Sequence, residues 1–237
     1  IKFLSSDPTT EEEGQIWYNS TSGTFKTTLV SEAWSSGASM ANTRTSGVGS
    51  AGIQTAGFYT GATTSPAGNN ITEEYNGVGR SAGGDQNDTK TQRIGFGTLT
   101  AGVVAGGNPS TTAVEEYDGS TWTNVTVMPA ASWDKGGFGT ETSGAVFGGG
   151  APSILDSTFE YNGASWTAGG TMVTGAKVIT GNGATQDAGM VVGGEVPAVS
   201  NQAATYDGAT WTAITVYPAS VAGACSNGPN TDAVVAG

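Results

Sequence analysis

Histidine is absent from the 237-residue chain, and cysteine occurs once, at Cys225. Without histidine, Ser-His-Asp and Cys-His nucleophilic catalysis are excluded. A structural zinc site is also excluded, because one cysteine and no histidine cannot supply its ligands. A single cysteine also excludes an intrachain disulfide. Cys225 lies in a run of small apolar residues, so we expect it to be buried. We predict no catalytic residues, no metal site, no cofactor and no enzymatic activity.

Basic residues are scarce as well. The chain has 8 Lys and Arg against 20 Asp and Glu, which gives a net charge of −12. Nucleic-acid binding requires a basic surface, and anionic membranes attract basic segments, so we predict neither partner. No apolar run reaches membrane-spanning length, and we therefore expect no membrane insertion.

Glycine, in contrast, is abundant, with 39 residues. It occurs with Thr and Val in short alternating runs, which is typical of strands joined by tight turns. No stretch repeats its apolar residues with a period of 3.6, so we expect almost no helix. Low-complexity disorder is the alternative for such a composition, but an ordered repeat and six Trp residues argue against it.

The repeat is clearest at residues 115–122, which read as two short strands joined by the turn Asp118-Gly119. Both residue types tolerate positive φ, so we predict a two-residue type I′ hairpin turn. Tyr-Asp-Gly or Tyr-Asn-Gly recurs in steps of 42, 44 and 45 residues, at Tyr75, Tyr117, Tyr161 and Tyr206. One hairpin per unit at this period indicates a propeller blade.

Two other features follow the same period. A Trp stands five residues after the Tyr in three units, as Trp122, Trp166 and Trp211, and Trp34 lies two periods before Trp122. Arg80 occupies the position between them. Preceding strands end in the glycine pairs Gly106-Gly107, Gly148-Gly149 and Gly193-Gly194.

Each unit is thus predicted to supply four antiparallel strands, which in the second complete unit lie near 92–98, 101–107, 112–117 and 120–127. The first strand is the richest in glycine, which suits the innermost position, where neighbouring backbones converge. Because the sequence begins with Ile1 rather than Met and ends within a repeat, we expect the natural chain to extend past one or both ends.

A strand ending in Gly-Gly, a Tyr-Asp/Asn-Gly turn and a Trp five residues after the Tyr resemble the kelch repeat of β-propellers. The resemblance covers residues 34–237 and implies structural roles for the repeated Tyr, Trp and Gly residues. It implies an all-β propeller of four-stranded blades with five units at least partly present. Pairing of the two chain ends would close a five-bladed ring; otherwise further blades follow.

Residues 1–33 differ from the repeats. They form an acidic lead-in followed by a predicted hairpin with strands at 15–19 and 24–30. Residues 5–26 resemble a lead-in of virion structural and tail-fibre proteins of marine and cyanobacterial bacteriophages. The resemblance implies a non-enzymatic viral protein on the virion surface, in an extracellular fibre or appendage. Other virion proteins, further copies of the chain and host-surface polysaccharide are the implied partners.

A carbohydrate-active or lectin-like secreted propeller is the alternative. Residues 118–122 are similar to the Asp-box of sialidase-type propellers, with one residue fewer between Asp and Gly. Sialidases also need three clustered arginines, and the chain has only Arg44, Arg80 and Arg93, of which Arg44 and Arg93 follow the repeat. A copper oxidase of the galactose oxidase kind needs His ligands, which are lacking.

Acidic residues recur just before the turn, as Glu73-Glu74, Glu115-Glu116 and Glu160. Glycoside hydrolysis needs two carboxylates within reach of one bond. Adjacent strand residues face opposite ways, however, so each pair is divided between two surfaces. We interpret these residues as a solvated outer strand. Asp85, Asn87 and Asp88 lie close in sequence but lack a recognised calcium-loop pattern.

Glycan contact is the site chemistry that we consider most plausible, because sugar rings stack on exposed aromatic side chains. Trp133 and Asp134 lie in an inter-blade loop and break the repeat. Tyr217 lies in a later equivalent loop, where Met128 is the earlier counterpart. We predict Trp133, Asp134 and Tyr217 as glycan-binding candidates; the alternative is that both rings cap blade edges. Trp122, Trp166 and Trp211 are predicted core residues.

Overall fold

The computed structural model describes residues 2–8, 16–27, 37–45, 49–61, 70–231 and 233–236. All regular structure in these ranges is β-strand, as predicted. They contain no helix long and apolar enough to cross a membrane. The chain divides into two compact units, residues 1–37 and 38–237. The predicted boundary between residues 33 and 34 lies outside the described residues, as does Trp34.

The N-terminal unit is a three-stranded sheet of β1 (Lys2–Leu4), β2 (Ile16–Asn19) and β3 (Thr24–Thr27). The hairpin β2–β3 was predicted, but the parallel pairing of β1 with β2 was not. Asp7 fixes the sheet, accepting hydrogen bonds from Trp17 Nε1 at 3.1 Å, Asn19 Nδ2 at 2.7 Å and Lys26 Nζ at 2.6 Å. These bonds, that from Lys26 first, lower the pKa of Asp7 to about 2.

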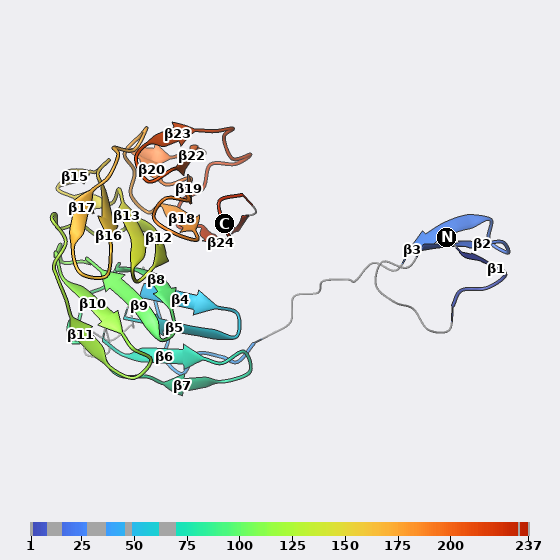
Figure 1. The fold of residues 1–237 in the computed structure, drawn as a ribbon, viewed down its shortest axis with the longest axis horizontal. Coiled ribbons are helices and arrows are strands. Elements are labelled where there is room, and N and C mark those ends of the chain that lie inside the picture. The colour runs from blue at the N-terminus through green and yellow to red at the C-terminus, as the bar shows by residue number, and fades with distance from the viewer. Residues whose placement is uncertain are drawn as a thin grey trace. The chain divides into compact units, whose positions relative to one another are not determined.

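The second unit consists of antiparallel sheets that Figure 1 shows in succession along the chain. Four of them have four strands each and are called blades 1 to 4. Blade 1 is β4 (Gly49–Ile53), β5 (Ala56–Thr60), β6 (Thr72–Tyr75) and β7 (Arg80–Ala82), and blade 2 is β8 (Ile94–Thr98), β9 (Ala101–Ala105), β10 (Val114–Tyr117) and β11 (Trp122–Asn124). Blade 3 is β12 (Gly136–Thr140), β13 (Ser143–Phe147), β16 (Thr158–Tyr161) and β17 (Trp166–Ala168), and blade 4 is β18 (Thr180–Gly183), β19 (Gly189–Val192), β22 (Ala203–Tyr206) and β23 (Trp211–Ala213).

Three two-stranded ribbons complete the unit. Blades 3 and 4 each carry a short ribbon between their second and third strands, and a further pair follows blade 4. The ribbons are β14 (Gly150–Ala151) with β15 (Ser153–Ile154), β20 (Glu195–Val196) with β21 (Ala198–Val199), and β24 (Cys225–Asn227) with β25 (Val234–Ala236). Cys225 is exposed at the start of β24, so the prediction that it is buried was wrong. Its neighbour Ser226 instead faces β18 and bonds Thr180 Oγ1 at 2.8 Å.

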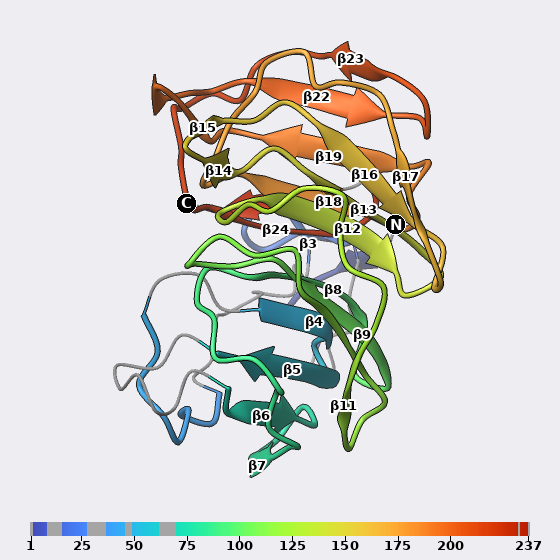
Figure 2. The same cartoon turned by 90° about the vertical axis from the view of Figure 1, so that its left-hand side faces the viewer.

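The blades are arranged as in a propeller, with the first strand of each innermost. In Figure 2 the strands β4, β8, β12, β18 and β24 follow one another through the middle of the unit, each next to its predecessor. Gly95 shows why glycine is needed there, since a Cβ at this position would lie 2.5 Å from Ser50 N of the neighbouring blade. The predicted innermost strand is therefore confirmed. The predicted closure of the ring by pairing of the two chain ends involves residues outside the described ranges, so it stays a prediction.

The hairpin turns differ from the predicted type I′ turn, which needs positive φ at both central residues. Gly119 has a φ of +91°, whereas Asp118 does not have positive φ. The backbone N–H of Asp118 donates to Thr121 O at 3.3 Å, so the central residues are Gly119 and Ser120. Asp118 Oδ1 accepts from the N–H groups of Ser120 and Thr121 at 2.8 and 2.7 Å. The aspartate thus caps the turn from its flank.

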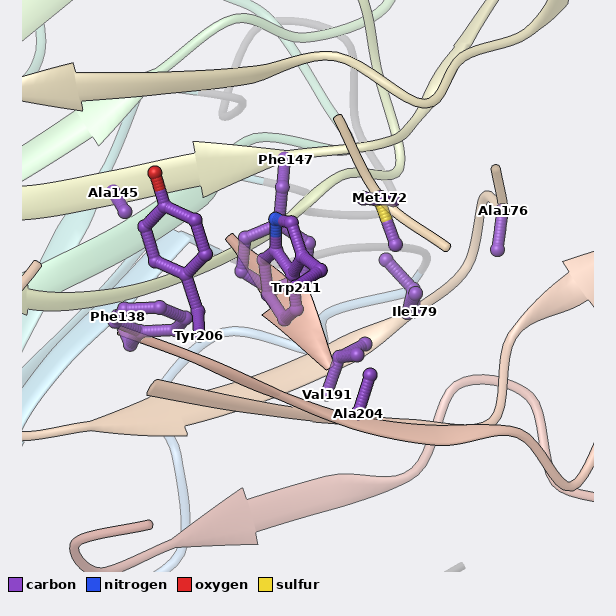
Figure 3. Close-up of a cluster of buried hydrophobic side chains, with 10 residues drawn as sticks. All are labelled: Phe138, Ala145, Phe147, Met172, Ala176, Ile179, Val191, Ala204, Tyr206 and Trp211. Carbon is purple, nitrogen blue, oxygen red and sulfur yellow. The ribbon is translucent and has the colours of Figure 1, made fainter. Parts of the chain in front are cut away.

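Stacked Tyr–Trp pairs fill the interfaces between blades. Their ring centroids lie 4.6 to 4.8 Å apart in Tyr117–Trp122, Tyr161–Trp166 and Tyr206–Trp211. Figure 3 shows Tyr206 and Trp211 of blade 4 packed with Phe138 and Phe147 of blade 3. In blade 1 the guanidinium of Arg80 lies 5.0 Å from the ring centroid of Tyr75. A cation–π contact therefore replaces the aromatic stack at the position that lacks Trp.

The glycine pairs connect each blade to the loop that enters the next. The N–H of the second glycine donates to a carbonyl of that loop: Gly107 to Ser132 at 3.1 Å, Gly149 to Ala176 at 2.8 Å and Gly194 to Val221 at 2.8 Å. All six glycines of the three pairs, Gly106, Gly107, Gly148, Gly149, Gly193 and Gly194, have positive φ. This backbone conformation explains why glycine recurs there.

Candidate functional site

The acidic residues before each turn are not a solvated outer strand. Glu73 is 2 % exposed and Glu115 is fully buried, so that interpretation was wrong for both. Each lies in an ion pair, Arg93 Nη1 being 2.7 Å from Glu115 Oε1 and Arg44 Nη2 being 3.1 Å from Glu73 Oε1. A buried carboxylate is tolerated when it is paired and hydrogen-bonded, and both are.

Backbone amides complete the two carboxylate sites. Glu115 also accepts from the N–H groups of Asn87 at 2.7 Å and Asp88 at 3.3 Å. Glu73 accepts from the N–H groups of Ala41 and Asn42 at 2.9 and 3.0 Å. Burial opposes ionisation of Glu73, but the bonds from Asn42, Ala41 and Arg44 outweigh it and lower its pKa. The acidic loop of residues 85–88 is thus bound to Glu115.

The second glutamate of the motif joins blades. The Tyr hydroxyl of one blade donates to the Glu of the preceding blade: Tyr117 to Glu74, Tyr161 to Glu116 at 2.7 Å, and Tyr206 to Glu160 at 2.8 Å. Burial and the bond to Glu160 raise the pKa of Tyr206 to about 12. The two glutamates of each pair face different surfaces, as predicted. Each of them, however, bonds another part of the fold.

A row of backbone hydrogen bonds links the residues that enter successive blades. Asp134 N donates to Gln92 O at 3.3 Å, Val178 N to Asp134 O at 2.9 Å, and Gly223 N to Val178 O at 3.0 Å. All four residues have left-handed backbones, with φ between 51° and 67°. The strained conformation of Asp134 is therefore a property of the repeat. Its side chain is what distinguishes it from Val178 and Gly223.

Trp133 directly precedes Asp134 of this row and forms a β-bridge with Gly150. One side of its indole covers Gly150, where a Cβ would lie 3.0 Å from the ring. Lys177 Nζ lies 5.6 Å from the ring centroid and 3.0 Å from Glu195 Oε2. Thr91 and Lys177 hold the equivalent bridging positions in blades 2 and 4. Trp133 thus meets an ion pair of the next blade.

Asp134 contributes a polar network beside the indole. Its Oδ2 accepts from Gln92 Nε2 at 2.8 Å, and Gln92 Oε1 accepts from Asn108 Nδ2 at 2.6 Å. Burial raises the pKa of Asp134, although the bond from Gln92 opposes the rise. Lys135 is 6 % exposed and donates from Nζ to Ser132 O. Burial lowers the pKa of Lys135 to about 7.

Tyr217 is not part of this group. Its N–H donates to Asn201 O at 2.9 Å, as that of Met128 does to Thr112 O, which confirms their predicted equivalence. Its hydroxyl donates to Val235 O of β25 at 3.3 Å. No contact described for Tyr217 includes Trp133 or Asp134. The structure therefore brings together two of the three glycan-binding candidates.

The remaining members of the group were not singled out in the sequence as site residues. Gln92, Asn108, Lys177 and Glu195 join Trp133 and Asp134 in what we call the loop-face cluster. The cluster draws residues from the entries of blades 2, 3 and 4, from the loop between β9 and β10 and from the ribbon β20–β21, separated by up to 103 positions. Only the break in the repeat at Trp133 marked the place in the sequence. In the described ranges, no group of three or more Cys, Asp or Glu residues is arranged to hold a metal ion.

Compared with known proteins, the chain matches no family model and no curated protein.

Proposed function

We propose that this chain is a non-enzymatic virion surface protein of a bacteriophage that displays a propeller for attachment to host-surface polysaccharide. The observation that carries the proposal is how the repeated polar side chains are used. Glu73 and Glu115 hold the loops that enter their blades, and Glu74, Glu116 and Glu160 bind the Tyr of the next blade. The repeat is thus a scaffold, and the non-repeated residues are free for recognition.

The loop-face cluster is the proposed attachment site. It combines one indole, an ion pair and a carboxylate bonded to an amide, which are groups that contact sugar rings and hydroxyls. The side chains of Lys177 and Glu195 are 29 % and 33 % exposed, so both are accessible to a ligand. Lys177 Nζ lies over the ring of Trp133, 5.6 Å from its centroid, and we expect a bound sugar to displace this side chain or to bond it.

Binding tests this site. Surface polysaccharide purified from host bacteria is titrated into the chain and into Trp133→Ala and Lys177→Ala variants, with Tyr217→Ala as a matched aromatic control. The proposal predicts that the first two variants bind at least tenfold more weakly and that the control binds like the parent. Equal binding by all variants would place recognition elsewhere, and sugar released during the titration would contradict the non-enzymatic assignment.

The virion assignment rests on the resemblance of residues 5–26 to phage structural proteins. Purified particles from the phage that encodes this sequence provide the test, by mass spectrometry of their proteins and by antibody labelling in the electron microscope. The proposal predicts the chain on intact particles, in a fibre or appendage. Its absence from particles, with the chain present in the culture fluid, would favour the secreted lectin-like alternative.

A further inference from the structure

The loop-face cluster offers a ligand no free positive charge. Lys177 is its only basic member, and Lys177 Nζ lies 3.0 Å from Glu195 Oε2. Asp134 adds a second carboxyl group. Burial is the main cause that raises the pKa of Asp134, and the charges of Lys177 and Glu195 also act on that pKa, in opposite directions. The cluster is therefore negative when Asp134 is ionised and neutral when Asp134 is protonated.

The remaining basic residues of the second unit are also engaged. They are Arg44, Arg80, Lys90, Arg93 and Lys135. The side chains of Arg44 and Arg93 are 2 % and 1 % exposed in their ion pairs, and Arg80 lies 5.0 Å from the centroids of two tyrosine rings. Lys135 is buried, and Lys90 Nζ lies 3.7 Å from Asp88 Oδ1. An acidic sugar is best bound by an exposed, unpaired arginine or lysine, which the described residues of this unit do not provide.

The amide and carboxyl groups of the cluster suit sugar hydroxyls instead. Gln92 Nε2 donates to Asp134 Oδ2 at 2.8 Å, and Asn108 Nδ2 donates to Gln92 Oε1 at 2.6 Å. These two bonds use only part of the hydrogen-bonding capacity of the three side chains, so donors and acceptors remain for a ligand. A hydroxyl both donates and accepts, and it can therefore bond either kind of group. The indole of Trp133 adds an apolar surface for the sugar ring.

We propose that the loop-face cluster binds an uncharged polysaccharide and that Glu195 determines this specificity by neutralising Lys177. The inference rests on the proposed function, because it names the class of polysaccharide that the same site takes. Two effects oppose an acidic polymer. Its carboxylates would meet the carboxyl groups of Asp134 and Glu195, and they would approach a chain with a net charge of −12. A neutral polymer meets neither barrier.

Binding of matched polymers tests the specificity. Surface polysaccharide purified from host bacteria is prepared in two forms of equal length, one with its carboxylates reduced to alcohols and one with its primary alcohols oxidised to carboxylates. Both forms are titrated into the full chain by isothermal calorimetry at low salt. We expect the reduced form to bind about tenfold more tightly than the oxidised form, and Trp133→Ala to weaken the binding of the reduced form.

The outcomes separate this inference from the proposed function. Tighter binding of the oxidised form, or equal binding of the two forms, would overturn the inference and leave polysaccharide attachment standing. Binding of neither form would contradict both.

A Glu195→Gln variant tests the role of Glu195. It removes the charge that neutralises Lys177 with little change in shape, so Lys177 becomes free to bond a sugar carboxylate. We expect the oxidised form to bind about fivefold more tightly than it binds the parent at low salt, and the gain to disappear at high salt. Asp187→Asn is the matched control, because it removes the same charge from an exposed residue that precedes β19, whereas Glu195 follows β19. An equal gain in both variants, or no gain in Glu195→Gln, would show that Glu195 does not set the specificity.

Discussion

Blades 2 and 3 use different residues at the same positions. Blade 2 begins after Arg93 and buries the ion pair of Arg93 with Glu115, the two side chains being 1 % and 0 % exposed. Blade 3 begins after Lys135 and has Phe159 where Glu115 stands, so its buried lysine bonds only a backbone carbonyl in the described structure. The comparison shows that the blade tolerates both a paired charge and an apolar side chain at this position.

The two blades also differ in how their Trp is held. Trp122 Nε1 of blade 2 donates to Thr72 Oγ1 of blade 1 at 3.0 Å, and Trp211 Nε1 of blade 4 donates to Thr158 Oγ1 at 2.9 Å. The equivalent residue before blade 3 is Val114, which has no acceptor. Trp166 Nε1 donates to Thr126 O at 2.9 Å, the carbonyl equivalent to Gly84 O, which Trp122 bonds in addition to Thr72; Trp166 thus lacks only the hydroxyl acceptor, and its ring is partly buried. The repeat determines the Tyr–Trp stack, while one residue of the preceding blade determines how deeply the Trp ring is buried.

Removal of the buried carboxylate of blade 2 should destabilise the protein most. Glu115→Ala leaves Arg93 buried without its partner, and we expect a loss of about 3–5 kcal/mol in the free energy of unfolding. Urea unfolding measures it. Glu195→Ala, which breaks a partly exposed pair, should cost less than about 1 kcal/mol. Similar small losses of unfolding free energy in both variants would show that the ion pair of blade 2 is not needed for stability.

The next effect concerns Lys135, whose folded pKa of about 7 lies below its ordinary value of 10.5. Between these values the unfolded chain binds a proton that the folded chain does not, so stability should rise with pH, by up to about 1.4 kcal/mol per unit. Lys135→Met should be more stable near pH 7 and abolish the rise. The raised pKa of Tyr206 affects stability only above pH 10, where it makes stability fall as pH rises. A parent whose stability is flat between pH 7 and 10 would contradict this account.

A smaller effect is expected at the Trp acceptors. Thr158→Val removes the acceptor of Trp211, and we expect a loss of about 1–3 kcal/mol because a buried N–H is left unpaired. Val114→Thr is the reciprocal change and should draw Trp166 inward, which would shift its fluorescence to shorter wavelength. Thermal unfolding and emission spectra measure the two changes. If Thr158→Val is neutral, the hydroxyl does not explain the difference between the blades.

The smallest effect concerns the left-handed entry residues. Asp134 suits this conformation, whereas the β-branched Val178, with φ of +51°, does not. Val178→Asn should therefore stabilise the protein, by about 1 kcal/mol. Differential scanning calorimetry would register a higher melting temperature. A lower one would show that packing of Val178 outweighs its backbone strain.

The sequence predicted the fold well because the fold is periodic. The Tyr-to-Tyr spacing, the glycine-rich first strands and the hairpin of each unit all correspond to observed features. Burial of Glu115 could not be predicted in the same way. It depends on Arg93, 22 residues earlier, and on backbone amides of residues 87 and 88, none of which a period-2 pattern reveals.

The candidate site was only partly predictable. Trp133 stood out as a break in the repeat, but the ion pair above it combines Lys177 with Glu195, which a ribbon between strands brings into place. The turn differs from the predicted one because its centre is Gly119-Ser120 rather than Asp118-Gly119, and Asp118 hydrogen-bonds the two residues after the glycine. The ion pair joins residues far apart in sequence, whereas the turn depends on a side-chain bond to the backbone two and three residues ahead.

We propose above that the repeated polar residues build the scaffold and that the loop-face cluster binds polysaccharide without cleaving it. The most direct measurement follows a length-defined host polysaccharide bound to the chain, by size-exclusion chromatography with light scattering. We predict that the polymer is bound at unchanged length and that a Trp133→Ala, Lys177→Ala double variant with an unchanged melting temperature no longer binds it. Shortening of the polymer, or undiminished binding by that variant, would contradict the account.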